Sequence, residues 1–145
     1  MIEVKEVSLE EAYEIHKQIP EFDDPKYTLE YFSDRIKDKK NLIIIGYIDK
    51  KPAGYIVSYD RYNDSSVYVW MVAVIPAFRK QGVLSAMMEY LEKWSKENGF
   101  TSIKIKTRNN RHEMQAYLVK NNFMFLEVEP RDEIIENRIL LEKKI

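Results

Sequence analysis

The sequence predicts a mixed α/β (α+β) fold in which a central sheet is flanked by helices. The length of 145 residues is that of one ordinary domain, and a hydrophobic fraction of 45% can fill a single core. Segments with period-two alternation are interspersed with segments whose apolar residues recur at helical spacing. Only 4 glycines and 5 prolines leave little room for flexible linkers, so we expect a single domain over residues 1–145.

The elements of the first half follow from alternation, capping and turn signals. Ser8 and Glu11 form a capping box, the sequence signature of a helix start. The polar run at residues 49–52 separates two apolar stretches and predicts a hairpin. The expected elements are a strand over residues 2–7, helices over about 8–19 and 28–36, and strands over 42–48 and 53–60.

The second half begins with an apolar strand over residues 67–75, whose continuous pattern is typical of a strand covered on both faces. Asn98-Gly99 ends the long helix that follows. The remaining expected elements are that helix over about 80–97, a strand over 102–107, a helix over 110–121, and strands over 123–128 and 138–142.

The junction between this strand and the long helix breaks the usual rules for a helix start. No Ser, Thr, Asp or Asn precedes Arg79 as an N-cap, and Arg79 and Lys80 put positive charge where the helix dipole favours anions. Gly82 falls in the expected first turn, at a cost of about 1 kcal/mol relative to alanine. A phosphate bound by free N–H groups would reconcile all three features. The alternative, a plain turn with solvated charges, leaves those N–H groups without partners.

Arg79-x-x-Gly82-x-Leu84 resembles the Arg/Gln-x-x-Gly-x-Gly/Ala signature of the GNAT superfamily of N-acetyltransferases. Residues 109–123 resemble that family's Asn…Ala…Leu-Tyr-x-Lys-x-Gly-Phe block. The resemblance implies the GNAT fold, with acetyl-CoA as cosubstrate, its pyrophosphate at the junction and its pantetheine arm along the preceding strand. The cofactor-binding residues that it implies are Val72, Ala73, Val74, Arg79, Lys80, Gln81, Gly82, Val83, Leu84, Ser85 and Asn110.

Asn110 is assigned by counting along the family's motif. Counting back from Phe123 puts the family's asparagine at Arg111, one residue away, and we take Asn110 as the cofactor contact. The alternative is that Asn109 or Asn110 only caps the next helix, and we expect one of them to do so.

Tyr117 is the catalytic candidate, because a tyrosine in this helix often protonates the departing CoA sulfur in the family. Counting from Lys120 and Phe123 gives the family's position to Leu118. Tyr117 is therefore displaced by about 100° around the helix, and the alternative is a tyrosine of the core. We expect Tyr117→Phe to lower turnover by less than about tenfold.

The acceptor site is predicted from an acidic loop. The family often takes a glutamate from the strand before the phosphate loop, where this chain has Tyr68 and Trp70, so that strand supplies no general base. The loop between the first two helices commonly lines the acceptor site in the family, so Glu21, Asp23 and Asp24 are the candidates for the general base. The same carboxylates predict a cationic amine. The alternative is a solvated turn. The substrate-binding candidates are Glu21, Phe22, Asp23 and Asp24.

Composition excludes several other classes. A formal net charge of −1, spread along the chain, argues against a general nucleic-acid or membrane binder. The absence of cysteine excludes disulfides and thiolate catalysis, and the isolated His16 and His112 argue against a metal site. A charged N-terminus and a longest apolar run of only residues 67–78 favour a cytoplasmic protein.

The function that these observations predict is an acetyl-CoA-dependent N-acetyltransferase. It would move an acetyl group directly to a primary amine of a small molecule or peptide. The alternative is a non-catalytic acyl-CoA-binding or protein-interaction module that keeps the GNAT fold. Because many relatives are dimers, the resemblance also indicates a homodimer.

Overall fold

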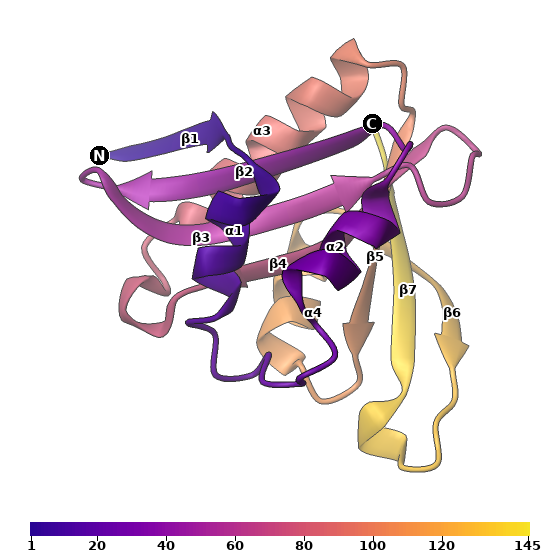
Figure 1. Cartoon of the computed structure of the whole chain (residues 1–145). Helices are drawn as coiled ribbons and strands as arrows, with labels where there is room; N and C mark the ends of the chain where they lie inside the picture. Colours follow the sequence, from indigo (N-terminus) through magenta and orange to yellow (C-terminus); the bar gives the residue numbers. More distant parts are fainter.

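The computed structural model describes residues 1–145, and its elements follow the expected order (Figure 1). Two short 3₁₀ helices, η1 and η2, are additional. The elements are β1 (Ile2–Glu6), α1 (Leu9–His16), α2 (Leu29–Ile36), β2 (Asn41–Ile48), β3 (Lys51–Tyr59), β4 (Ser66–Val74), η1 (Pro76–Phe78), α3 (Val83–Glu97), β5 (Ser102–Arg108), α4 (His112–Lys120), β6 (Met124–Glu129), η2 (Ile134–Glu136) and β7 (Arg138–Lys144). None of these helices combines the length and the apolar character needed to cross a membrane.

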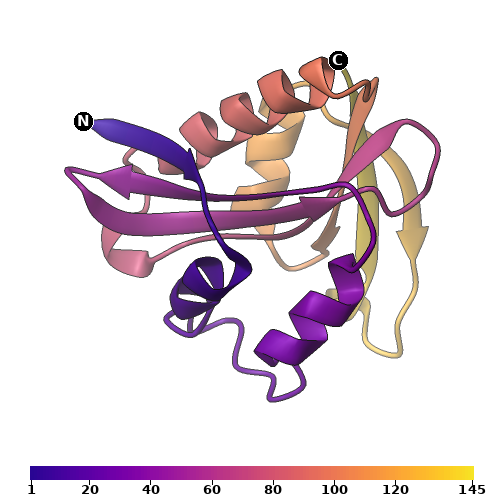
Figure 2. The same ribbon diagram turned by 45° about the horizontal axis from the view of Figure 1, so that its top comes forward.

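One seven-stranded sheet, in the order β1-β2-β3-β4-β5-β7-β6, separates two hydrophobic clusters. Neighbouring strands are antiparallel except β4 and β5, which are parallel. The cluster on one face includes Met87 and Leu91 of α3 and Leu118 of α4. The cluster on the other face includes Ala12 of α1 and Phe32 of α2. Figure 2 shows this division, with α3 above the sheet and α1 and α2 below it.

The two parallel strands separate before they end. Their pairing stops at Val69 and Ile105, although β4 continues to Val74 and β5 continues to Arg108. The backbone groups that residues 70–74 direct toward β5 therefore have no strand partner. An opening through the sheet lies at this point.

A β-bulge decides which side chains of β4 face this opening. Val57 and Ser58 of β3 pair with Met71 and Val69, so Trp70 is the extra residue on β4. Beyond the bulge, Val72 packs with the α3 cluster and Ala73 packs with the α1–α2 cluster. The bulge thus sets which residues of the strand reach each face of the sheet.

The structure moves the start of the long helix from about residue 80 to Val83. Gly82 is its N-cap and has a φ of 92°, and Lys80 also has a positive φ, of 63°. The left-handed conformation at these two residues prevents the helix from extending further back. The expectation that Gly82 lies in the first turn was therefore wrong.

The start of α4 also differs from the prediction. Its N-cap is Arg111, which makes no side-chain cap bond, so the expectation that Asn109 or Asn110 caps the helix was wrong. The Asn109 side chain instead donates to the carbonyl of Ile134 in η2. The turn between β2 and β3 is also shorter than the expected residues 49–52. Asp49 and Lys50 both adopt positive φ and close a two-residue turn.

Candidate active site

A cavity of about 1000 Å³ opens where β4 and β5 separate. Its walls come from β4, the start of α3, the end of β5, α4, the α1–α2 loop and the β6–β7 connection. It brings together nearly all of the residues that the sequence singled out. These are Glu21, Phe22, Asp23, Asp24, Val72, Ala73, Val74, Arg79, Lys80, Gly82, Val83, Leu84, Ser85, Asn110 and Tyr117. Gln81 is outside the cavity lining, and its side-chain amide donates to the carbonyl of Ala77.

Six consecutive backbone N–H groups, those of residues 80–85, donate to no acceptor within the protein. Gly82 and Lys80 turn the chain so that these donors precede a helix of 15 residues, whose first turn contains no acidic side chain. Successive N–H groups at a positive helix end form an anion-binding site. We call residues 80–85 the amide cradle, and its donors suit a phosphate-bearing ligand.

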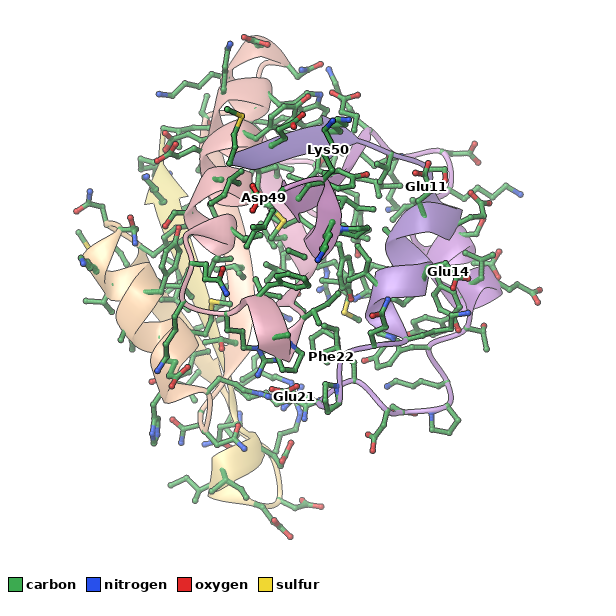
Figure 3. All side chains as sticks on the ribbon, turned by 90° about the vertical axis from the view of Figure 1, so that its left-hand side faces the viewer. Glu11, Glu14, Glu21, Phe22, Asp49 and Lys50 are labelled. Carbon is green, nitrogen blue, oxygen red and sulfur yellow. The ribbon has the colours of Figure 1, made fainter.

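The Arg79 side chain is held by contacts within the protein. Its guanidinium makes two contacts of 3.0 Å with the Glu21 carboxylate, and its Nε donates to the carbonyl of Val74. Its own N–H donates to the carbonyl of Pro76. Arg79 therefore ties the α1–α2 loop to the end of β4, and it adds no free donor to the amide cradle. Figure 3 shows Glu21 and Phe22 beside the short helix that precedes α3.

The hydrogen bonds from Arg79 also lower the pKa of Glu21 below its ordinary value. A carboxylate with a lowered pKa is a weaker base, which argues against Glu21 as the general base. In the same loop, the Asp24 carboxylate accepts the N–H of Lys26, whereas Asp23 is exposed. Phe22 stacks on the buried ring of His16, with the ring centroids 5.5 Å apart, so Phe22 forms an apolar part of the wall.

Tyr117 faces the cavity, and the core position belongs to its neighbour. Leu118 is fully buried, whereas Tyr117 is half-buried, lies at the edge of the core cluster and lines the cavity together with Ser85. Tyr117 therefore both packs against the core cluster, as the alternative predicts, and lines the cavity, and its catalytic role stays a prediction. Burial raises the pKa of Tyr117, and the Ser85 side chain acts in the opposite direction.

Sequence reasoning missed a basic and aromatic part of the lining. Its members come from the α1–α2 loop, α2, the β3–β4 loop, β4, β5 and the β6–β7 hairpin, so they are scattered over more than 100 positions. The only local signal is the alternation of Lys104, Lys106 and Arg108 along β5. The missed residues are Tyr27, Tyr31, Arg35, Arg61, Tyr68, Trp70, Lys106, Arg108, Arg131 and Arg138.

Solved structures with the same fold are acetyltransferases of low sequence identity, among them N-acetyltransferases. The ribosomal-protein-S18-alanine N-acetyltransferase of Escherichia coli aligns with a TM-score of 0.82 and 17% identity, covering 100% of this chain and 94% of that one. Ard1 of Thermoplasma volcanium aligns with a TM-score of 0.82 and 17% identity, covering 99% and 97%. PaiA N-acetyltransferase of Thermoplasma acidophilum, solved with coenzyme A, aligns with a TM-score of 0.74 and 15% identity, covering 100% and 99%.

A search of curated proteins found no match. The sequence model of the acetyltransferase (GNAT) family matches residues 9–123, which contain the amide cradle, the diverging strands and all of α4. The chain therefore belongs to the acetyltransferase (GNAT) family, whose members use acetyl-CoA.

Proposed function

We propose that this chain is an N-acetyltransferase that moves the acetyl group of acetyl-CoA directly to a primary amine, as one domain over residues 1–145. The observation that carries the proposal is the convergence of three features on one cavity. These are the free N–H groups of the amide cradle, the edge of β4 that is unpaired toward β5, and the half-buried side chain of Tyr117.

Acetyl-CoA supplies an activated thioester at this site. The N–H groups of residues 80–85 hold its phosphates, and the backbone groups of Val72, Ala73 and Val74 that are not bonded to β3 or to Arg79 hold its pantetheine amides. The N–H of Val72 is our candidate donor to the thioester oxygen as negative charge develops on it. The side chain of Asn110, which is exposed at the mouth of the cavity, is the remaining cofactor contact.

Tyr117 is our candidate general acid. The amine nitrogen forms its bond to the acetyl carbon while the carbon–sulfur bond breaks, and the Tyr117 hydroxyl donates its proton to the leaving sulfur. Water accepts the proton that the amine loses. Water also returns a proton to the Tyr117 oxygen after the transfer. A raised pKa keeps Tyr117 protonated at neutral pH, which a general acid requires. With no cysteine in the chain, direct transfer is favoured over a cysteinyl acyl-enzyme.

The test is release of CoA in the presence of a panel of primary amines. Because the chain has no cysteine, a thiol-reactive dye reports CoA alone. Amine-dependent release, with an acetylated product found by mass spectrometry, is the expected result. If the protein binds CoA yet releases none with any amine, the non-catalytic acyl-CoA-binding module is the better description.

The homodimer and the cytoplasmic location stay predictions. For the dimer, the surface to examine is β6, an edge strand on which Met124, Phe125, Leu126 and Val128 are all exposed. Exposed apolar edge strands favour association. Light scattering coupled to gel filtration measures the mass directly, and a mass near 17.4 kDa at all concentrations would contradict the dimer.

A further inference from the structure

We propose that the acceptor amine carries an oxyanion, a carboxylate or a phosphate, which the arginines of the cavity bind on the sheet face opposite α3. The inference rests on the proposed function, because it names the chemical class of the acceptor for the same reaction. It replaces the sequence-based expectation of a cationic amine.

The basic residues lie on the other face of the sheet from the amide cradle. Along β5, Ile103 and Ile105 pack in the core cluster that contains α3. Lys106 and Arg108 alternate with them and therefore point to the opposite face. The sheet thus separates phosphates bound at the start of α3 from these cations. The cations are therefore available to bind the acceptor.

Arg35 and Arg61 are the centre of this basic group, because neither has a carboxylate partner. The Nε of Arg35 donates to the Tyr59 hydroxyl at 2.8 Å, and its guanidinium lies 4.9 Å from the centre of the Trp70 ring. The guanidinium of Arg61 lies 4.8 Å from the centre of the Tyr68 ring. Aromatic side chains therefore hold both guanidinium groups in place.

The neighbouring cations are only partly neutralised. Lys106 and Arg131 share the carboxylate of Glu129, at 2.8 and 3.7 Å. In the same way, Arg108 and Arg138 share the carboxylate of Glu136, at 3.5 and 3.7 Å. Six cations thus face two carboxylates, and the exposed Asp23 and Asp24 on the opposite loop do not remove the excess.

Shifts of pKa agree with this excess of positive charge. Burial lowers the pKa of Arg138, and repulsion from Arg108 and Arg131 lowers it further. A hydrogen bond from Lys106 lowers the pKa of Glu129, and Arg61 adds to that effect. Because the whole chain has a net charge of −1, this positive potential is local to the cavity.

This arrangement suits an anionic acceptor chemically. A guanidinium binds a carboxylate or phosphate through a fork of two N–H donors, and the rings of Tyr27, Tyr31 and Trp70 can cover the carbon skeleton. Surrounding cations also disfavour the ammonium form of the acceptor and so increase the share of the nucleophilic neutral amine. The basic group thereby compensates in part for the missing glutamate of β4.

The first experiment compares acceptors in matched pairs. The pairs are β-alanine with β-alaninamide, phosphoethanolamine with ethanolamine, and peptides that begin Ser-Asp and Ser-Asn. We expect the anionic member of at least one pair to show a kcat/KM about tenfold higher, and the three pairs distinguish carboxylate, phosphate and peptide sources. If the neutral member is equal or better in every pair, the inference is overturned while the proposed function stands.

Substitutions of single residues test whether Arg61 causes the preference for an anionic acceptor. Arg61→Gln should raise the KM for the preferred anionic acceptor about fivefold or more, with the KM for acetyl-CoA unchanged and a smaller loss of kcat/KM for the neutral counterpart than for the anionic one. Arg61→Lys should restore only part of the loss, and Lys96→Gln, an exposed cation in the last turn of α3, should change nothing. An equal rise in the KM for acetyl-CoA would overturn the inference, because Arg61 would then bind acetyl-CoA and not the acceptor.

Calorimetry with N-acetyl-β-alanine and its amide gives a readout independent of turnover. We expect the acid to bind more tightly than the amide and Arg61→Gln to remove the difference. If no amine is acetylated, the proposed function fails, and this measurement still decides whether the cavity prefers an oxyanion. Equal binding of acid and amide would overturn that preference.

Discussion

The two ends of the cavity offer a ligand different kinds of groups. At the start of α3 the proposed ligand-binding groups are the main-chain N–H donors of residues 80–85, which have no acceptor within the protein. At the acceptor end they are side chains, Arg35 and Arg61 above all, which converge from α2 and from the β3–β4 loop. A site built from backbone tolerates changes of side chain, such as Leu84 where the family's signature has a small residue. A site built from side chains changes with every substitution, so it is the end at which acceptor specificity can vary.

The largest expected effect is that of Gly82→Asp on the backbone-built end. The substitution puts a Cβ 3.3 Å from the Ile2 side chain, strains a φ of 92°, and places a carboxylate among the donors meant for phosphate. We expect the affinity for CoA, measured by calorimetry, to fall by about a thousandfold.

Gly99→Asp is the matched control for this variant. Gly99 also has a positive φ, of 84°, but it follows the far end of α3 and a Cβ there meets no atom within 4 Å. Both variants carry the same backbone strain, so only a loss specific to Gly82→Asp supports the amide cradle. Equal CoA affinity in the two variants would show that the phosphates bind elsewhere.

Tyr117→Phe tests the proposed role of Tyr117 as the general acid. If Tyr117 protonates the leaving sulfur, kcat falls by about a hundredfold, while the affinity for CoA stays the same. Tyr90→Phe is the control, because Tyr90 is also half-buried but bonds to Glu6 outside the cavity. A loss of less than about tenfold would return Tyr117 to the structural role that its displacement in the sequence suggested.

The comparison also explains what could be predicted from the sequence. The order of elements and the amide cradle were predictable, because alternation, caps and an uncapped basic helix start are local signals. The basic group was not, because Arg35 and Arg61 become neighbours only after α2 packs on the sheet. The place of Tyr117, packed against the core cluster and also lining the cavity, was not predictable for a related reason. A motif register fixes spacing, but packing decides whether Leu118 or Tyr117 enters the core.

A smaller effect is expected from the ion pair that links the two ends. Arg79 and Glu21 are 39% and 33% exposed, so their contacts are screened by solvent. Arg79→Gln and Glu21→Gln should each change the Kd for CoA by no more than about threefold, with a coupling in a double-mutant cycle of about 1 kcal/mol or less. A tenfold loss with Arg79→Gln alone would show that its guanidinium moves to the phosphates when CoA binds.

The smallest effect concerns His16, which lies behind Phe22 in the acceptor wall. Its Nδ1 is 2.8 Å from the Tyr55 hydroxyl, and burial lowers its pKa below 6.5. Between the folded-state pKa and 6.5 the unfolded chain binds more protons, so stability falls as pH is lowered through this window. We expect Tm to drop between pH 7 and pH 5 by about 2 to 4 °C for each kcal/mol lost, and His16→Asn to flatten that dependence. NMR titration, with His112→Gln to assign the two histidines, measures the pKa itself, and a value at or above 6.5 for His16 would contradict its buried neutral state.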